Sequence, residues 1–330
     1  MKIAIVGAGT TGAYCYRLLT TLGFQVDIFD RTRKTACGIN PCAWGTSRGF
    51  TKQLEDVGLD PEKYILQRFH SVMMDEVRIP GELMTIHKPA LIRDLLGGSK
   101  IKGDRFKMAD YGRVIDATGI ARAFLPPIKN DVLLPCIQQR LQPKKRLENR
   151  IQLGRLGYAW CFPLGELGVH IGCGSLASNP RKMLKELGWL SNPSPSSDQK
   201  PTCACSGNVR LTGPHDALPF VTERGGAPVW GIGEAIGCVA PLAGDGIVPG
   251  MKSVSLLIEN WENPEEYTRS ILKEFEWMKN ERTVIDKILE ATPLGIKDAW
   301  VLRKNAKRMG MRVGMKEAMK FLKVLRLAGI

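Results

Sequence analysis

The sequence predicts an α/β fold in which a split Rossmann-type domain is interleaved with an antiparallel sheet and followed by a helical C-terminal region. Apolar, β-branched stretches typical of buried parallel strands occur at three distant places, 2–6, 113–117 and 229–232, and each runs into glycine. Stretches of alternating polarity, the pattern of half-buried antiparallel strands, lie between them. From residue 248 onward the pattern is mostly helical.

The order of these segments indicates a discontinuous nucleotide-binding domain. One interrupted domain fits the recurring glycine-ended strands better than two consecutive domains do. The expected division is a nucleotide-binding domain from 1–60, 90–145 and 216–255, a substrate-binding antiparallel sheet from 61–89 and 146–215, and a helical basic region at 256–330. Along the chain we expect antiparallel strands at 64–87 and 150–176, a short helix at 89–96 and an exposed linker at 192–206.

The composition bounds the class of protein. The chain has 330 residues, of which 44% are hydrophobic, enough for a buried core. Its nine cysteines are scattered, which excludes the dense disulfide framework of small secreted domains and favours a reducing cytoplasm. No apolar stretch is long enough to cross a bilayer, so any membrane contact is expected to be peripheral. The net charge of +14 suggests a nucleic acid or membrane partner, or simply a basic enzyme.

A glycine motif directly follows the first strand. Residues 7–12 have the G-x-G-x-x-G spacing, with a helical pattern after them. Gly7 permits the tight turn, Gly9 lets the backbone approach a pyrophosphate, and Gly12 lets the helix pack closely on the strand. Asp30 ends the second strand, where a carboxylate can bond a ribose hydroxyl. Together these features favour a dinucleotide site over a purely structural turn, and the acid argues against a 2′-phosphate at that position.

Two further glycine segments extend this site. The first is the turn at Gly119 that ends the strand at 113–117. Taken alone, this turn could equally well be structural or bind a ligand. Residues 231–253 resemble the flavin-binding end of the geranylgeranyl reductase family, within the hydroxylase-like FAD superfamily. In that family the strand ends in Gly-Asp-Ala and its acid bonds the ribityl chain of FAD; the matching residue here is the longer Glu234. The resemblance covers residues 1 to about 255 and implies FAD as the cofactor.

The resemblance assigns a second contact to the glycines of the same segment. Gly244, Gly246 and Ile247 match the family positions whose backbone N–H groups approach the flavin pyrimidine. They lie at the start of a helix, whose dipole favours the reduced anionic flavin.

Two other segments resemble motifs of this family. Residues 157–163 resemble its Tyr-x-Trp-x-Phe-Pro motif, which lines the lipid-substrate cavity. Tyr158, Trp160 and Phe162 alternate along a strand, so all three should face one side, either a substrate cavity or an aromatic core. Cys37 resembles the cysteine of the family's Pro-Cys-Gly segment near the flavin, where a thiol could donate a proton or gate the flavin; a structural cysteine is the alternative.

No metal site is expected. Zinc would need Cys37, Cys42, Cys203 and Cys205 as ligands, but their spacings are poor. The four histidines are dispersed and form no recognisable constellation.

The C-terminal region concentrates positive charge. Residues 296–330 contain ten Lys or Arg and two acids. One helical face would carry Arg312, Lys316, Lys320 and Lys323, and another Met311, Met315, Met319, Leu322 and Leu325. This pattern indicates either an amphipathic helix at an anionic membrane surface or a packed helix with a solvated basic face.

The resemblance implies an FAD-dependent reductase that saturates isoprenoid C=C bonds of a prenyl, geranylgeranyl-type lipid, with electrons from an external donor. A flavin-dependent monooxygenase of the same fold is the first alternative. An RNA-associated flavoprotein is the second; without an aromatic and basic RNA-binding module, nucleic acid is not favoured. The expected location is the cytoplasm, with peripheral contact at the inner membrane face as an option.

Overall fold

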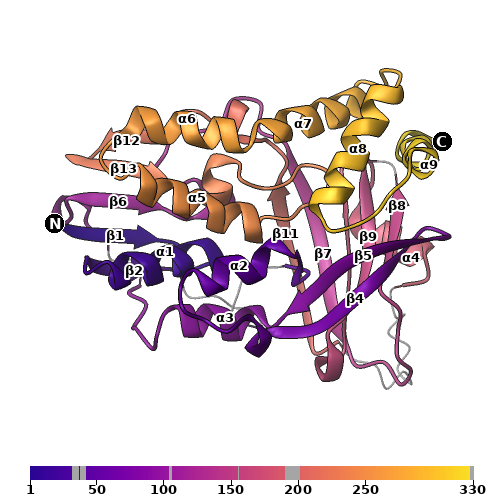
Figure 1. Cartoon of the computed structure of the whole chain (residues 1–330), viewed down its shortest axis with the longest axis horizontal. Helices are drawn as coiled ribbons and strands as arrows, with labels where there is room; N and C mark the ends of the chain where they lie inside the picture. Colours follow the sequence, from indigo (N-terminus) through magenta and orange to yellow (C-terminus); the bar gives the residue numbers. More distant parts are fainter. Residues whose placement is uncertain (32–36, 38–41, 104–105, 155, 190–200, 328–330) are drawn as a thin grey trace.

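Two sheets lie side by side, the first at the left of Figure 1 and the second at the right, with the last helices of the chain above the second. The computed structural model describes residues 1–31, 37, 42–103, 106–154, 156–189 and 201–327. The predicted α/β fold with an interleaved antiparallel sheet and helical C-terminus is confirmed.

The first sheet contains the three predicted glycine-ended strands. In spatial order its strands are β12 (Val221–Arg224), β13 (Ala227–Gly231), β6 (Arg113–Asp116), β1 (Lys2–Val6) and β2 (Gln25–Phe29). All pairs except β12 with β13 are parallel, and β1, β6 and β13 are almost fully buried, which explains their unbroken apolar sequences. Because the chain leaves β1 for β2 on one side and reaches β6 on the other, the carboxyl ends of these strands form the crevice where ligands bind in such sheets.

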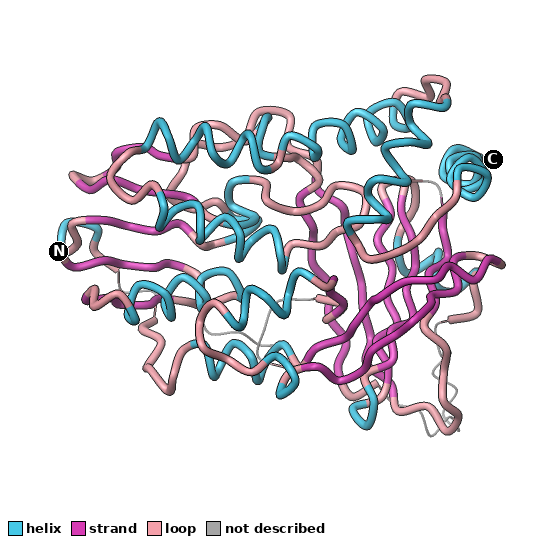
Figure 2. Tube along the Cα trace, in the orientation of Figure 1, coloured by secondary structure: helices cyan, strands magenta, loops and turns pink. Residues whose placement is uncertain are grey.

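Helices cover this sheet. Figure 2 shows two of them lying along one face of the first sheet, α1 (Thr10–Thr21) and α5 (Ile247–Glu259). The predicted short helix at 89–96 is α3, which spans Lys88–Leu95. The other elements attached to this half are α2 (Gly49–Glu55), α3 (Lys88–Leu95) and the 3-10 turns η1 (Pro61–Lys63), η2 (Met108–Asp110), η3 (Gly119–Ala121), η5 (Pro214–Asp216) and η6 (Gly233–Ile236).

The second sheet has eight strands. In spatial order they are β11 (Cys203–Arg210), β7 (Leu133–Leu141), β10 (Val169–Ser175), β9 (Gly157–Pro163), β8 (Arg150–Gly154), β4 (Ile65–Met74), β5 (Val77–Ile86) and β3 (Gly45–Ser47). Every neighbouring pair is antiparallel except β4 with β8. The predicted antiparallel stretches at 64–87 and 150–176 are confirmed. The turn η4 (Gly165–Leu167) joins β9 to β10, and α4 (Pro180–Glu186) packs on β10.

The sheet boundaries differ from the sequence-based division at three places. Strands β7 and β3 fall in segments assigned to the nucleotide-binding domain, yet both pair within the second sheet. Strand β11 begins inside the predicted linker at 192–206, whose part at 192–200 lies outside the described residues. Local sequence hides these strands because their partners lie far away in the chain, so pairing rather than local pattern fixes them.

The predicted helical C-terminal region contains four helices after α5. They are α6 (Pro264–Glu274), α7 (Glu276–Leu289), α8 (Ile296–Arg308) and α9 (Met315–Leu327). Within the described ranges, none of the helices has the length and apolarity needed to span a bilayer.

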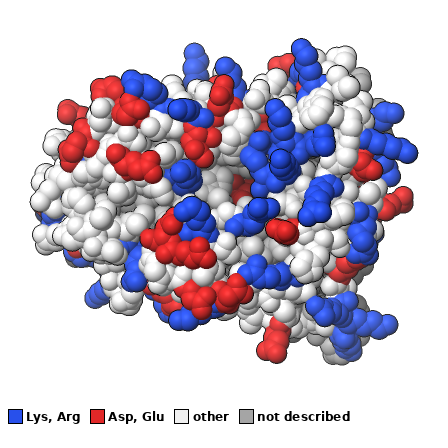
Figure 3. Space-filling model, viewed as in Figure 1, with Lys and Arg blue, Asp and Glu red and all other residues white. Residues whose placement is uncertain are grey.

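Helix α9 uses its apolar face for packing. Its apolar residues join a core with Val72 and Ile79 of the second sheet, whereas Lys316, Lys320 and Lys323 are exposed. Met311 and Arg312 precede the helix, and Met311 bridges to Gly81. Of the two alternatives for this helix, the structure supports the packed helix with a solvated basic face, because the apolar residues pack on the chain's own core. In Figure 3 Lys and Arg gather over the half of the molecule that carries α8 and α9.

The turn that leads into β3 is held by the second sheet. His170 on β10 is 3% exposed, and its Nδ1 lies 3.1 Å from the carbonyl oxygen of Ala43. The ring of Trp44 packs edge-to-face on His170, with ring centroids 4.7 Å apart. Burial lowers the pKa of His170 to about 4, so this ring is neutral at neutral pH.

The neutral state of His170 predicts a loss of stability on acidification. The unfolded chain takes up a proton below the ordinary pKa of 6.5, whereas the folded chain resists protonation down to about 4. The contribution of neutral His170 to the free energy of unfolding should therefore be fully present above pH 6.5. It should be lost as the pH drops towards 4, by up to about 3 kcal/mol at roughly 1.4 kcal/mol per pKa unit.

Urea unfolding as a function of pH measures this effect. His170→Asn keeps an N–H donor for Ala43 without titrating, so its unfolding free energy should depend less on pH than that of the wild type. His70→Asn, at an exposed position, serves as the control and should behave like the wild type. The same pH dependence in all three proteins would refute a buried neutral His170.

Candidate functional site

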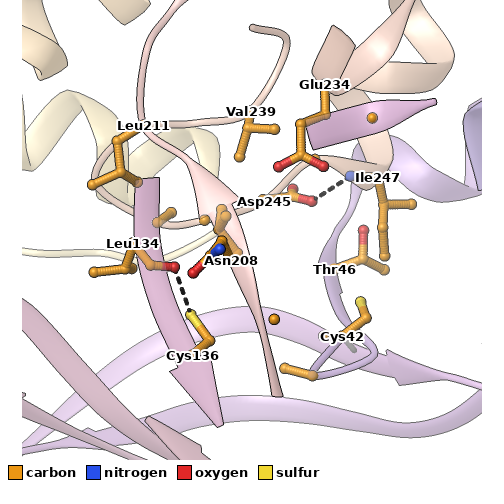
Figure 4. A pocket seen from close by; sticks show the side chains of 18 of the residues that line it. Cys42, Thr46, Leu134, Cys136, Asn208, Leu211, Glu234, Val239, Asp245 and Ile247 are labelled. Carbon is orange, nitrogen blue, oxygen red and sulfur yellow. Dashed lines mark hydrogen bonds between the residues drawn. The ribbon is translucent and has the colours of Figure 1, made fainter. Parts of the chain in front are cut away.

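One cavity of about 970 Å³ runs from the carboxyl edge of the first sheet, across the second sheet, to the C-terminal helices. Figure 4 shows part of its wall, with Glu234 and Asp245 from the first half facing Cys136 and Asn208 of the second sheet. Every residue that the sequence assigned to the cofactor lines it: Gly7, Gly9, Gly12, Asp30, Gly119, Glu234, Gly244, Gly246 and Ile247.

The glycine turn after β1 has two glycines fixed by packing and one that is open. A Cβ at Gly7, whose φ is +108°, would lie 2.2 Å from the carbonyl oxygen of Ala117. A Cβ at Gly12 would lie 1.9 Å from the carbonyl oxygen of Gly7. A Cβ at Gly9 would meet no atom within 4 Å. The backbone of Gly9, at the N-terminus of α1, is therefore accessible to a phosphate group from the cavity.

Two carboxylates lie on this part of the cavity wall. Asp30 accepts the N–H of Ala8 at 2.8 Å, so it also holds the glycine turn. Glu234 accepts the N–H of Arg210 at 2.9 Å, and burial raises the pKa of its carboxyl. A Cβ at Gly119 would lie 3.2 Å from Oε2 of Glu234, so the turns after β6 and β13 meet at this residue.

Arg210 fixes the turns after β6 and β13 relative to each other. Its side chain is 3% exposed and pairs with Asp131, with Nε 3.1 Å from Oδ1 and Nη2 3.0 Å from Oδ2. It also donates to the carbonyl oxygens of Ile120 at 2.8 Å and Glu234 at 2.6 Å. Because this buried guanidinium is paired and hydrogen-bonded, it positions Glu234 at the cavity wall.

The loop 241–246 forms the centre of the cavity wall. The hydroxyl of Tyr158 donates to the carbonyl oxygen of Ala243 at 2.5 Å. Asp245 accepts the N–H of Ile247 at 3.0 Å, at the N-terminus of α5. Burial raises the pKa of Asp245 to about 6.

The same loop is tied to the C-terminal helices. Glu281 on α7 is fully buried and lies 3.4 Å from the N–H of Leu242, which donates to it. Asn305 and Arg308 of α8 donate to the other oxygen of Glu281, at 3.0 and 2.5 Å. Asn305 itself lines the cavity. The C-terminal helices therefore complete the cavity and brace its central loop.

The three alternating aromatic residues of β9 share one side, as their alternation predicts, and that side faces the cavity. Tyr158, Trp160 and Phe162 line it together. The Trp160 ring lies across Gly172 of β10, where a Cβ would be 2.3 Å from Cζ2. Trp160 Nε1 donates to Gln138 at 3.3 Å. The glycine on the neighbouring strand leaves room for the indole, which fixes the orientation of the ring.

The far end of the cavity is apolar. Strands β4 and β8 supply one wall, and α7, α8 and α9 supply the other. Among the side chains that line it are Met74, Ile151, Leu153, Ile288, Phe321 and Leu325. This end can accept a long apolar group beside the polar end near the glycine turn.

The structure places the cysteines differently from the sequence-based expectation. Among the described residues, Cys42 and Cys136 line the cavity, whereas Cys37 does not. Cys37 lies against Cys203 of β11, where burial and the neighbouring thiol raise the pKa of Cys203. A direct contact of the Cys37 thiol with a ligand in this cavity is therefore not supported. No group of three or more metal-ligating side chains occurs in the described part of the chain.

Three residues of the site were missed from the sequence. Asp245 lies inside the segment that was compared with the FAD family, and as an acid between two glycines it could have been noticed. Arg210 and Gln138 carry no local signal, because their partners are distant in sequence. Gln138 bonds both Trp160 and the carbonyl oxygen of Cys42, at 3.3 and 2.9 Å.

Comparison with known proteins identifies the fold. No protein-family model matches the sequence. An uncharacterized protein of Methanocaldococcus jannaschii is 24% identical over 334 residues, covering 87% of this chain and 90% of that protein.

Solved structures of flavoproteins superpose along nearly the whole chain. A geranylgeranyl bacteriochlorophyll reductase-like protein from Thermoplasma acidophilum has a TM-score of 0.66 at 16% identity, covering 98% of each chain. A flavoprotein/dehydrogenase from Cytophaga hutchinsonii has a TM-score of 0.64 at 13% identity, covering 99% of each chain. A probable FAD-dependent monooxygenase from Pseudomonas aeruginosa has a TM-score of 0.60 at 14% identity, covering 92% of this chain and 99% of that one. The chain therefore has the fold of FAD-dependent oxidoreductases.

Proposed function

We propose that this protein is an FAD-dependent reductase that saturates isoprenoid C=C bonds of a prenyl lipid. The observation that carries the proposal is the continuity of one cavity, which joins a dinucleotide-type glycine turn to an apolar chamber under the C-terminal helices. A cofactor and a long apolar chain can lie in contact within it. The sequence resemblance to geranylgeranyl reductases and the fold shared with a geranylgeranyl bacteriochlorophyll reductase-like protein support the same function.

The polar end of the cavity fits FAD. Gly9 leaves open space at the N-terminus of α1 for a pyrophosphate, while Asp30 and Glu234 offer carboxylates to ribose and ribityl hydroxyls. The glycines of the loop 241–246 bring its backbone to the cavity wall. These groups would hold the cofactor along the carboxyl edge of the first sheet.

The apolar end fits a prenyl chain. A volume of about 970 Å³ is at the upper end of the usual range for ligand sites, which suits two large ligands better than one small one. Bound FAD would supply hydride chemistry at N5. The protein's part is to orient the alkene with the aromatic side chains of β9 and to exclude water with the C-terminal helices.

A flavin-dependent monooxygenase is the second candidate. A probable FAD-dependent monooxygenase shares the fold, and one fold can carry either chemistry. NADPH oxidation coupled to oxygen consumption and a hydroxylated product would favour this candidate. A reductase would instead give a product with two more hydrogens per reduced bond and no added oxygen.

Substituting Gly9 tests the cofactor site. Gly9→Val should abolish FAD binding, because the side chain would fill the open space next to the glycine backbone. Gly103→Val, at an exposed glycine where a Cβ also meets no atom, is the matched control and should retain FAD. Cofactor released from the purified proteins is measured by chromatography. Normal FAD content in Gly9→Val would limit this glycine to a structural role, and FMN or no flavin in the wild type would defeat the proposal.

Substituting Trp160 tests the substrate part. Lipid extracts of a prenyl-lipid-producing host should gain saturated products when it expresses the wild type. Trp160→Ala should lower this reduction by about 10- to 100-fold through misplacement of the alkene, with FAD content intact. Trp160→Phe keeps an aromatic ring on β9 and loses the bond to Gln138, so it should reduce the lipid more than Trp160→Ala does. Equal product from all three proteins would place the substrate elsewhere.

The exposed basic face of α9 supports a further proposal, contact with an anionic membrane while the helix stays packed. Each basic residue near such a surface contributes on the order of 1 kcal/mol to the free energy of membrane binding, and salt weakens this attraction. Vesicle co-sedimentation should need anionic lipid and should drop when Lys316, Lys320 and Lys323 become Glu. The matched control changes three other exposed lysines to Glu, Lys63, Lys129 and Lys273. Equal loss in both triple variants would show that only net charge matters.

A further inference from the structure

Asp245 puts a carboxylate where α5 begins. Its Oδ1 accepts the N–H of Ile247 at 3.0 Å, and the residue is 8% exposed and lines the cavity. Figure 4 shows this side chain on the cavity wall next to Ile247. The N-terminus of a helix stabilises negative charge, and here a side chain of the chain itself already takes that position. Any second negative charge that arrives at this place must meet the carboxylate.

The groups around Asp245 offer limited compensation. Lys88 of α3 is the cation that favours the charged form of Asp245, and it favours the charged form of Glu234 as well. Tyr158 and Cys136, which share the cavity wall, have pKa values raised by burial, so both are neutral at neutral pH. Cys42 also lines this part of the wall. Glu234 also has the guanidinium of Arg210 beside it, whereas the cation that acts on Asp245, in surroundings of low dielectric constant, is Lys88.

We propose that Asp245 takes up a proton when a flavin in this cavity is reduced and releases it when the flavin is reoxidised. This inference rests on the FAD binding of the proposed function, but not on the identity of the substrate. Two electrons from an external donor enter the flavin, one proton adds at N5, and a second proton adds to the Asp245 carboxylate. On reoxidation two electrons and two protons leave together, as the saturation of one C=C bond requires.

The pH range of this uptake follows from the position of Asp245. Burial raises the pKa of Asp245 to about 6, so the group is a carboxylate at neutral pH before the flavin is reduced. Negative charge on the reduced flavin raises that pKa further, so the proton is taken up above pH 6. Below this value Asp245 is already protonated before reduction and contributes no uptake.

Counting protons tests the proposal without any substrate. The FAD-loaded protein is reduced electrochemically, without oxygen, in weakly buffered solution at neutral pH with an indicator dye. The wild type should take up about two protons for each two electrons, and D245N about one. D245N keeps a carbonyl oxygen as acceptor for Ile247, so the start of α5 is preserved. D75N removes another buried carboxyl with a raised pKa, one that does not line the cavity, and should match the wild type.

Each other outcome has a defined meaning. Equal uptake by the wild type and D245N would overturn the inference, because the second proton would then lie on the flavin or on another residue. Uptake of one proton by the wild type would overturn it as well. If D245N loses FAD, D245S retains a hydroxyl acceptor at the same place and is measured instead. Wild-type protein that binds no FAD at all would defeat both the inference and the proposed function, whereas equal counts with FAD bound defeat only the inference.

Discussion

The conformation of the loop 241–246 depends on hydrogen bonds from three separate parts of the chain. Tyr158 of the second sheet donates to Ala243, Glu281 of α7 accepts from Leu242, and Ile247 at the start of α5 donates to Asp245. Two of its six residues are glycines, whose backbone loses the most freedom on folding, so these bonds help to hold the loop against the entropy of a free chain. The cavity exists because the loop is held between the two sheets and the C-terminal helices.

This arrangement explains why buried charge recurs around the cavity. Arg210 with Asp131 fixes the turns after β6 and β13, and Glu281 with Arg308 fixes the contact between the loop and α8. Pairing lowers the cost of burying each charge, and the planar guanidinium of Arg210 holds several carbonyl groups at once. The polar end of the cavity is thus rigid, while the apolar end is walled by flexible Met and Leu side chains that can adapt to a lipid chain.

The sequence predicts the first sheet and the polar end of the site well, because their signals are local. Gly7, Gly9 and Gly12 follow one another in a single turn, and the alternation of Tyr158, Trp160 and Phe162 indicates that these three side chains share one side. The sequence does not predict β7, β11, the role of Arg210 or the packing of α9, because these depend on partners far away in the chain. The amphipathic pattern of α9 shows that one face is covered; only the fold shows that the chain's own core covers it.

The central claim is that a flavin and an isolated alkene meet in one cavity. Anaerobic single-turnover reoxidation tests it most directly: protein with reduced FAD is mixed with a prenyl lipid, and the flavin absorbance and the lipid mass are followed together. The lipid should reoxidise the flavin without oxygen and gain two hydrogens per flavin. Flavin that stays reduced with the lipid, and is reoxidised only when oxygen enters with formation of a hydroxylated product, would contradict it.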